Sequence, residues 1–314
     1  MFPVTLEDIH HAAERIRPYA HRTPVFTSKA LDKMVGGHVF LKCENLQKVG
    51  AFKFRGACNA VFSLSDKEAQ NGVATHSSGN HAAALALAAQ IRGIPAYIVM
   101  PKTASEVKKN AVAGYGGQIK FCKKTLASRE ATLEEVVDQT NATVIHPYND
   151  YRIIAGQGTA TAELLQDVPL PDIILAPVGG GGLLSGSALS AHFISPKTKV
   201  IGVEPALAAD AAKSFRTGKL QPPFPPKTIA DGLLTALGDK TFACIREFVD
   251  DIVTVDENEI IEAMRFVWER MKIIIEPSSA VPVAAAIKQK IPCEGKRIGI
   301  IISGGNVDLS QLPW

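Results

Sequence analysis

The sequence predicts an α/β protein built on open, mostly parallel sheets. Short apolar segments recur along the chain, with helix-type patterns between most of them. Residues 172–178 (DIILAPV) form an apolar run of the kind found in parallel strands that helices cover on both faces. Two such segments lead directly into small or glycine residues that open a helix, and ligands in these folds bind at the carboxyl ends of strands. The length of 314 residues suggests about two domains.

Each element follows from a local pattern. Thr5 is suited to cap a first helix, with acidic residues in its first turn. We expect strands at residues 39–42, 73–75, 96–100, 119–121, 143–146, 172–178, 200–203, 251–255 and 297–302. We expect further helices from residue 80 to about 91, over 128–140, from 183 onward and over 257–271. The proline-rich segment at 221–226 (QPPFPP) is predicted to be a surface loop.

The composition excludes several classes of protein. The 34 basic and 31 acidic residues leave a net charge of +3 without a long basic run, which argues against a nucleic-acid partner. No stretch approaches the ~20 apolar residues of a membrane span. The N-terminus lacks the pattern of a secretory signal. The 5 cysteines are scattered and contain no CxxC pair, so we expect them to be reduced and the protein to be cytoplasmic.

Four consecutive glycines, Gly179 to Gly182, stand between a buried strand and a helix. Glycine lets the backbone approach a ligand, and the free N–H groups together with the helix dipole favour an anion such as phosphate. The run is neither a P-loop, since no Gly-Lys-Ser/Thr follows, nor a GxGxxG dinucleotide motif in a first βαβ unit. A tight structural turn is the alternative, but the entropy cost of four glycines favours an anion site.

Three further segments are candidates for chemistry. Residues 77–81 (SSGNH) follow a strand and open a helix, so their N–H groups suit a carboxylate, although a helix N-cap uses the same residue types. Lys53 stands between two phenylalanines, and partial burial would lower its pKa and make it a candidate Schiff-base amine instead of a surface residue. Ser303 ends a buried strand, where either a ligand contact or a plain turn is expected.

Taken in order, these segments resemble the fold-type II pyridoxal-phosphate (PLP) enzymes, and among them the serine racemase and serine/threonine dehydratase family. The resemblance covers nearly the whole chain. Its motifs are AFKFRGA at 51–57, SSGNHA at 77–82, GQGT at 156–159, VGGGGLLSG at 178–186, GVEP at 202–205 and SGGNVD at 303–308. It implies a large domain of residues 1–64 and 149–314, a small domain of residues 65–148, and a homodimer.

The resemblance also implies a role for each matching residue. The implied cofactor-binding residues are Phe52, Lys53, Asn80, Gly179, Gly180, Gly181, Gly182, Leu183 and Ser303. Lys53 would hold PLP covalently and take the α-proton of the substrate. Asn80 would hydrogen-bond the ring hydroxyl, and the glycine run would bind the phosphate. A neutral serine at 303, facing the pyridine nitrogen, would moderate the electron withdrawal by the ring.

A second set of residues would contact the amino-acid substrate, namely Ser77, Ser78, Gly79, Asn80, His81, Arg129 and Tyr148. Ser78 occupies the position of the second acid/base of the family's racemases, where many threonine dehydratases carry alanine; the alternative is that it only binds the carboxylate. Arg129, with His76 and Tyr148-Asn149, could receive a second carboxylate, or it could be an exposed helix residue. Some racemases have a smaller polar residue in place of Tyr148.

A metal site is implied at Glu204 and Asp210, with the Ala208 carbonyl as a third ligand. Such oxygen ligands suit Mg²⁺, Ca²⁺ or Mn²⁺ in a structural role. Without the resemblance, two acids six residues apart would be assigned to a solvated face. Activation by a nucleotide, known in some relatives, has no recognisable motif in this chain.

The expected function is that of a PLP-dependent serine racemase that also eliminates water from L-serine to give pyruvate and ammonia. The alternative is a 3-hydroxyaspartate or L-threonine dehydratase. A third possibility is a regulatory protein that keeps the fold without the chemistry. The presence of Lys53, Ser78, Asn80 and Ser303 argues against it.

Overall fold

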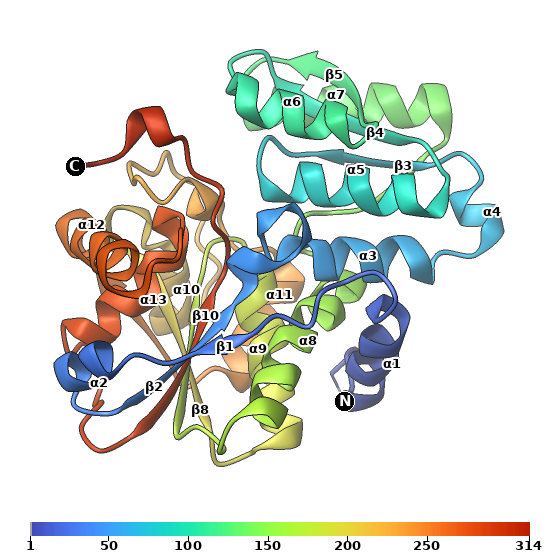
Figure 1. Cartoon of the computed structure of the whole chain (residues 1–314). Helices are drawn as coiled ribbons and strands as arrows, with labels where there is room; N and C mark the ends of the chain where they lie inside the picture. The colour runs from blue at the N-terminus through green and yellow to red at the C-terminus, as the bar shows by residue number, and fades with distance from the viewer. Residues whose placement is uncertain (1) are drawn as a thin grey trace.

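The computed structural model describes residues 2–314 as two open sheets covered by helices (Figure 1). One sheet has the strand order β1-β2-β10-β7-β8-β9 and is parallel except for β1, and the other is parallel with the order β5-β4-β3-β6. The strands are β1 (Val25–Phe26), β2 (His38–Cys43), β3 (Val73–His76), β4 (Ala96–Pro101), β5 (Gln118–Cys122), β6 (Thr143–Val144), β7 (Ile173–Pro177), β8 (Lys199–Pro205), β9 (Asp251–Val255) and β10 (Arg297–Ile302). The predicted α/β class is confirmed.

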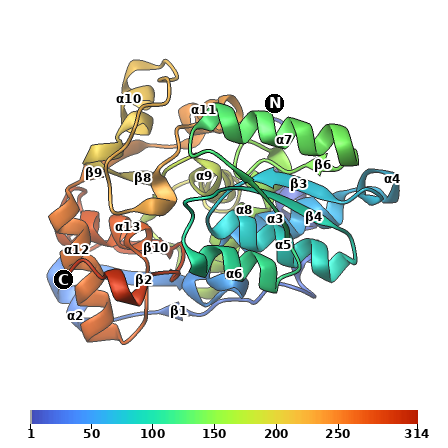
Figure 2. The same cartoon turned by 90° about the horizontal axis from the view of Figure 1, so that it is seen from above.

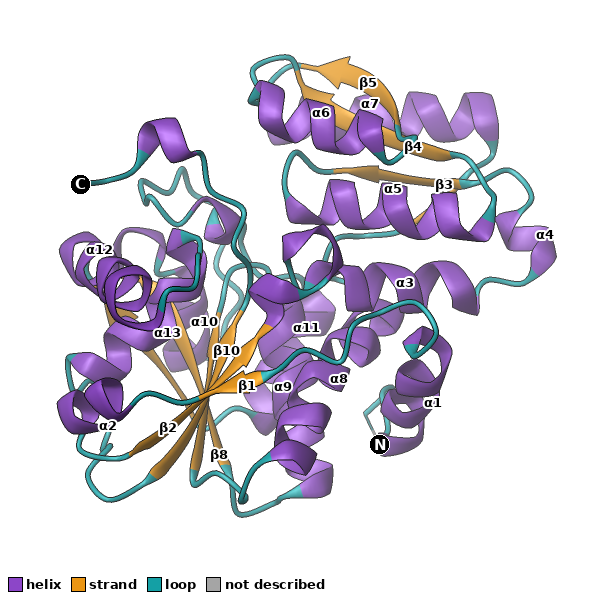
Figure 3. Ribbon diagram, viewed as in Figure 1, coloured by secondary structure: helices purple, strands orange, loops and turns teal. Residues whose placement is uncertain are grey.

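Helices cover both faces of each sheet (Figure 3). The α-helices are α1 (Leu6–Ile16), α2 (Lys29–Val35), α3 (Lys53–Ser63), α4 (Asp66–Ala69), α5 (Asn80–Arg92), α6 (Glu106–Gly114), α7 (Leu126–Thr140), α8 (Tyr151–Asp167), α9 (Gly182–Ile194), α10 (Asp210–Thr217), α11 (Asp239–Phe248), α12 (Glu257–Phe266) and α13 (Pro277–Ile287). Short 3₁₀ turns include η1 (Glu44–Leu46), η2 (Lys48–Gly50), η3 (Ala206–Ala208), η4 (Asp231–Leu233) and η6 (Leu309–Gln311). Across residues 2–314, none of these helices has both the length and the apolar character that crossing a membrane requires.

The two sheets draw on different parts of the chain. The four-stranded sheet uses only residues between 73 and 144, and Figure 2 shows α7 on one face of it and α5 and α6 on the other. The six-stranded sheet combines strands from residues 25–43 with strands from residues 173–302. The small sheet therefore lies within the predicted small domain of residues 65–148, while the boundaries of that domain stay a prediction.

One predicted helix changes character before its end. The helix expected over 257–271 is α-helical only to Phe266 and continues as a π-helical turn, η5 (Val267–Met271). Lys272 then adopts a left-handed conformation with φ of +62° and stops the helix. Trp268 in this turn donates its indole N–H to the carbonyl of Ile275, at 3.0 Å, which ties the turn to the segment leading into α13.

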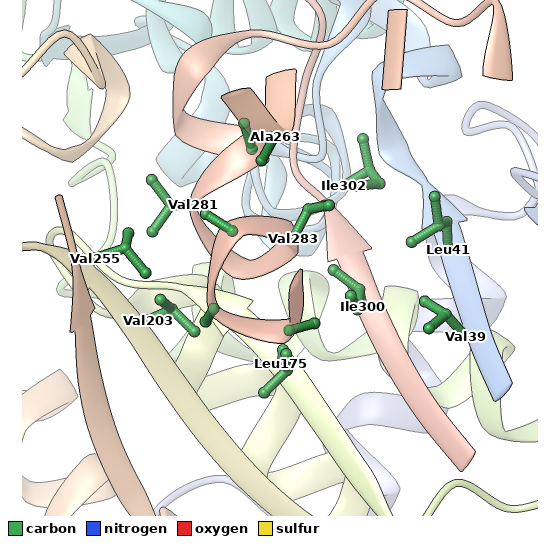
Figure 4. Packing of buried hydrophobic residues seen from close by; sticks show 14 of the residues in the cluster. Val39, Leu41, Leu175, Val203, Val255, Ala263, Val281, Val283, Ile300 and Ile302 are labelled. Atoms are coloured by element: carbon green, nitrogen blue, oxygen red, sulfur yellow. The ribbon is translucent and has the colours of Figure 1, made fainter. Parts of the chain in front are cut away.

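The largest buried cluster lies between α13 and the six-stranded sheet (Figure 4). Val281 and Val283 on α13 pack over strand residues that include Leu175, Val203 and Ile300. All five side chains are fully buried, and each contributes about 1.5–3 kcal/mol to folding through the loss of contact with water. This packing fixes the position of α13, whose N-terminus faces the cavity described below.

Glycine pairs allow α3, α8 and α9 to cross at close range. A Cβ on Gly156 would lie 2.7 Å from the Cα of Gly56, and a Cβ on Gly186 would lie 2.5 Å from the backbone nitrogen of Gly158. Distances below about 3 Å leave no room for a side chain, so these positions require glycine. Helix α3 begins at Lys53, and α9 follows the glycine run, so α8 sets the positions of both.

A buried network of charges anchors α3 to the large sheet. Arg55 donates to Glu44 through Nε at 2.7 Å and to Glu163 through both Nη atoms at 2.8 Å. Lys42 on β2 donates to the same Glu163 at 2.7 Å. Two cations and two carboxylates thus compensate one another, which is what burial of charged groups requires. Because Arg55 lies two residues after Lys53, the network also restrains the start of α3.

Candidate active site

A cavity of about 690 Å³ lies where strands β3, β7 and β10 end. It is lined by residues from both sheets, and it takes in every residue of the two predicted sets for cofactor and substrate. Carboxyl ends of parallel strands are the usual place for ligands in such folds. The structure therefore brings the predicted site residues together, although the individual role of each residue stays a prediction.

Lys53 lies at the first turn of α3, with its amine inside the cavity wall. Its Nζ donates to the carbonyl of Pro147 at 2.8 Å and lies 5.2 Å from the centroid of the Phe52 ring. The backbone N–H of Phe52 donates to the carbonyl of Ser303 at 2.9 Å, which joins this turn to the end of β10. Burial lowers the pKa of Lys53 to about 8, against an opposing effect of Glu276. A lowered pKa increases the neutral, nucleophilic fraction of the amine.

The glycine run forms a turn in which a Cβ on Gly179, Gly180 or Gly181 would lie less than 3.0 Å from a neighbouring atom. Gly181 has a φ of +87° and precedes the first turn of α9. A Cβ on Gly180 would lie 2.3 Å from the ring of Tyr148, and one on Gly179 would lie 2.9 Å from the Cα of Leu233. Thr241 donates to the carbonyl of Gly180 at 2.8 Å and so fixes the orientation of that peptide. The N–H groups at the start of α9 have no partner within the helix and suit an anion.

The segment before α5 presents small polar groups to the cavity. The N–H of Gly79 donates to the hydroxyl of Ser77 at 3.4 Å, and the Ser78 hydroxyl has no hydrogen-bond partner within the described chain. His81 is buried, and its Nε2 lies 3.2 Å from the carbonyl of Ile145. That contact requires the proton on Nε2, while Nδ1 is buried without a partner. Burial lowers the pKa of His81 well below its usual range, so the ring is neutral.

Ser303 and Asn80 supply polar groups from opposite parts of the chain. The hydroxyl of Ser303 lies 2.9 Å from that of Ser279 on α13, and Ser303 is 2% exposed. The amide nitrogen of Asn80 donates to the carboxylate of Glu276 at 3.1 and 3.2 Å, and its oxygen accepts from Asn306 at 3.0 Å. Both predicted cofactor contacts are therefore held by neighbours and not by solvent.

Arg129 lines the cavity from α7 without a protein partner. Its Nε is buried and unpaired, and Arg129 forms no ion pair among residues 2–314. His76 and Tyr148 line the same cavity, and the ring of His146 lies 6.2 Å from His76 and 4.6 Å from Tyr148. Asn149, which the sequence grouped with Tyr148, is turned to α11, where its amide donates to Asp239 at 2.7 Å.

Several lining residues were missed by the sequence analysis. Glu276 is 3% exposed, and burial raises its pKa to about 7. Lys108 on α6 donates to Asp231 of η4 at 2.6 Å and so connects the two sides of the cavity, one next to each sheet. The QPPFPP segment is a loop, as predicted, but its residues 223–226 line the cavity. A signal for Glu276 was present, because a proline at the first helical position marks the start of α13.

The predicted metal ligands lie outside this cavity. The two oxygens of Glu204 accept from the N–H groups of Ala211 and Ala212, at 3.0 and 2.9 Å, so Glu204 caps α10. One oxygen of Asp210 is buried without a partner. Burial raises the pKa of Glu204 to about 8 and that of Asp210 to about 6. In the described part of the chain no group of three or more His, Cys, Asp or Glu side chains could hold a metal. This finding does not test the predicted site, because that site has only two carboxylates and a backbone carbonyl.

Comparison with known proteins identifies the class. A family model described as "Pyridoxal-phosphate dependent enzyme" matches residues 16–304, and the chain belongs to this family. It is 49% identical to the beta-hydroxyaspartate dehydratase of Paracoccus denitrificans, with 100% of both chains covered. It is 52% identical to the serine racemase of Arabidopsis thaliana, covering 97% of this chain and 93% of that one. The crystal structure of serine racemase from Dictyostelium discoideum superposes with a TM-score of 0.94 at 49% identity, covering 98% of this chain and 99% of that chain.

The cavity fits pyridoxal phosphate, the cofactor of this family. The Lys53 amine has a pKa of about 8, close to neutral pH, and the glycine run offers backbone N–H groups for a phosphate. Asn80 and Ser303 add an amide and a hydroxyl in the same cavity. Phe52 provides an apolar ring beside the amine. A nucleophilic amine, an anion cradle and neutral polar groups are the set that a phosphorylated aldehyde on an aromatic ring requires.

Proposed function

We propose that the chain is a serine racemase that also converts L-serine to pyruvate and ammonia. The observation that carries this proposal is that the Lys53 amine and the Ser78 hydroxyl line one cavity. PLP, when bound, withdraws electrons from the α-carbon of the substrate and makes its proton acidic. Lys53 accepts that proton, and Ser78 is the second group that holds a proton for the other face. Serine racemases at 47–52% identity support the assignment.

Lys53 also supports loss of water. Once the α-proton is on Lys53, departure of the β-hydroxyl with a proton removes one water from serine. Uptake of one water then releases ammonia and leaves pyruvate, so the atoms balance. Ser78 is not needed for this branch. The two activities therefore depend on Lys53 in common and on Ser78 separately.

The test is Ser78→Ala assayed on L-serine and D-serine, with pyruvate and chirality both measured. Because alanine removes the hydroxyl and little else, racemisation should fall at least a hundredfold while pyruvate formation falls less than tenfold. Lys53→Ala is the control, and it should abolish both activities. Equal losses of racemisation and pyruvate formation in Ser78→Ala would reject the two-group mechanism.

A second candidate is elimination of water from 3-hydroxyaspartate. The unpaired guanidinium of Arg129 favours it, because a buried donor without a partner suits the second carboxylate of such a substrate. The relatives named as hydroxyaspartate dehydratase and ammonia-lyase also support it. Arg129→Gln should lower kcat/KM for L-threo-3-hydroxyaspartate at least tenfold more than for L-serine. A panel that also includes L-threonine tests the alternative of an L-threonine dehydratase. Equal losses on all substrates in Arg129→Gln would refute the role of Arg129.

We also propose a structural Mg²⁺, Ca²⁺ or Mn²⁺ ion at Glu204, Asp210 and the Ala208 carbonyl. The buried, unpaired oxygen of Asp210 supports it. An ion that binds only the folded chain stabilises it by mass action. Treatment with EDTA should therefore lower the melting temperature, and Asp210→Asn should remove that sensitivity. A melting temperature unchanged by removal of all bound metal would count against the site.

A further inference from the structure

The carboxyl of Glu276 is a buried polar group in the cavity wall that the proposed chemistry does not use. It stands at the residue before α13 and is 3% exposed. Among residues 2–314 no Lys, Arg or His nitrogen lies within ion-pair distance of it. It accepts instead from the side chain of Asn80 and from the backbone N–H of Asn306, the latter at 3.2 Å. A buried carboxyl held only by amide donors needs an explanation.

The contacts of Glu276 determine which way the Asn80 amide points. Asn306 donates one N–H to the carbonyl of Val49 at 2.7 Å and the other to the oxygen of Asn80 at 3.0 Å. Because a carbonyl only accepts, the Asn306 amide cannot turn over, and neither can that of Asn80. A flipped Asn80 would set its NH₂ against that of Asn306 and its oxygen against the carboxylate. The Asn80 nitrogen lies 3.2 and 3.1 Å from the two oxygens of one carboxyl group, so a single N–H directed between them accounts for both contacts and leaves the second N–H for a ligand.

The backbone around Glu276 is shaped to hold it in place. A Cβ on Gly304 would lie 2.9 Å from one carboxyl oxygen and 3.0 Å from the other, so a larger residue there would displace the carboxyl from its present place. The N–H of Glu276 donates to the carbonyl of Gly304 at 3.0 Å. Asn80 belongs to the segment around the small sheet, whereas Glu276, Asn306 and Gly304 belong with the large one. The network thus fixes a small-sheet residue from the large-sheet side.

We propose that Glu276 is a positioning residue that orients the Asn80 amide so that its free N–H faces the ring hydroxyl of PLP. The inference rests on the proposed contact between Asn80 and that hydroxyl. A donor at this place stabilises the deprotonated ring oxygen, which only accepts, and so lowers the pKa of the ring hydroxyl.

The experiment compares Glu276→Gln, Asn80→Ala and the double variant as full-length holoenzymes. Equilibrium dialysis gives the dissociation constant of PLP, and a pH titration of the visible absorbance reports the ionisation of the ring. Glutamine has one oxygen for two donors, and its NH₂ would face them, so Asn80 should lose its orientation. We expect each single variant to weaken PLP binding at least tenfold and to raise the pH of the spectral transition. The double variant should bind within threefold of Asn80→Ala.

Glu257→Gln is the matched control. Its carboxylate likewise accepts a backbone N–H, from Ile229 at 2.8 Å, at the first turn of α12 and outside the cavity. It should bind PLP as the unmodified protein does. If Glu276→Gln fails to fold, Asn306→Ala removes the donors to the oxygen of Asn80 and to the carbonyl of Val49 while keeping the backbone N–H that Glu276 accepts. It should weaken PLP binding only when Asn80 is present.

Two results would overturn the inference, and they differ. Additive losses in Glu276→Gln and Asn80→Ala would mean that Glu276 does not act through Asn80, while the proposed contact of Asn80 would stand. Unchanged PLP binding in Asn80→Ala would remove the contact itself and the inference with it. In that second case the racemase proposal would still be judged by the Ser78→Ala assay.

Discussion

Replacing Gly180 with alanine should weaken PLP binding at least tenfold. The added Cβ would lie 2.3 Å from Cδ1 and Cγ of Tyr148 and 2.5 Å from its Cε1. Carbon atoms in contact sit about 3.5–4.0 Å apart, so the loop and the ring must separate by more than about 1 Å. Hydrogen bonds from N–H to oxygen span only about 2.7–3.2 Å, and a shift of this size breaks at least one to the phosphate. One charge-assisted bond contributes about 1.5–3 kcal/mol, and about 1.4 kcal/mol is tenfold in affinity.

The assay is equilibrium dialysis of the full-length holoenzyme, with circular dichroism to check the fold. Gly114→Ala is the control, because a Cβ there meets no heavy atom within 4 Å and the residue lies in α6. It should leave PLP binding unchanged. Tyr148→Ala should relieve the clash, so Gly180→Ala should cause no further loss in that background. PLP binding within threefold of the unmodified protein in Gly180→Ala alone would refute the role of Tyr148 in supporting the glycine run.

Two other predictions concern the stability of the full-length chain. With PLP removed, Lys53 has a pKa of about 8 when folded against 10.5 as the ordinary value, so the unfolded chain binds more protons between these pH values. Stability should therefore rise with pH across this window by at most about 1.4 kcal/mol per unit. Urea unfolding at pH 8 and pH 10 measures this rise, and an equal rise in Lys53→Met would contradict it. Arg55→Met leaves the buried carboxylate of Glu44 without a cation, while Glu163 keeps Lys42, and it should lower the unfolding free energy by about 3–5 kcal/mol in urea. A loss below about 1 kcal/mol would show that the network does not anchor α3.

The described strands other than the two-residue β1 were predicted from the sequence, and several helices were not. Strands β9 and β10 have the predicted boundaries, because short apolar runs between turn residues are local signals. Helix α13 was missed, because its residues (PSSAVPVAAAI) are buried from 278 to 286 on every side. A helix surrounded by protein has no polar face, so its sequence shows no 3.6-residue period. Helices α3 and α8 are also buried over most of their length, and they were missed for the same reason.

Some residues of the candidate site were likewise predictable from the sequence, and others were not. The residues predicted for the cofactor and the substrate belong to local features, such as a strand end followed by glycines, and all of them line the cavity. Glu276 was missed because its partner Asn80 is 196 residues away along the chain. Lys108 and Asp231 meet across 123 residues. Only the folding of the two sheets against each other brings such pairs together, and no local pattern records it.

Residues 146–149 link the two halves of the cofactor site. The carbonyl of Pro147 accepts from the Lys53 amine, and the next residue, Tyr148, packs against Gly180. The turn is held by Nδ1 of His146, which accepts the N–H groups of residues 148 and 149 at 3.3 and 2.9 Å. Such acceptance requires a neutral ring, and burial lowers the pKa of His146 to about 4. One segment therefore supports both the amine and the glycine run.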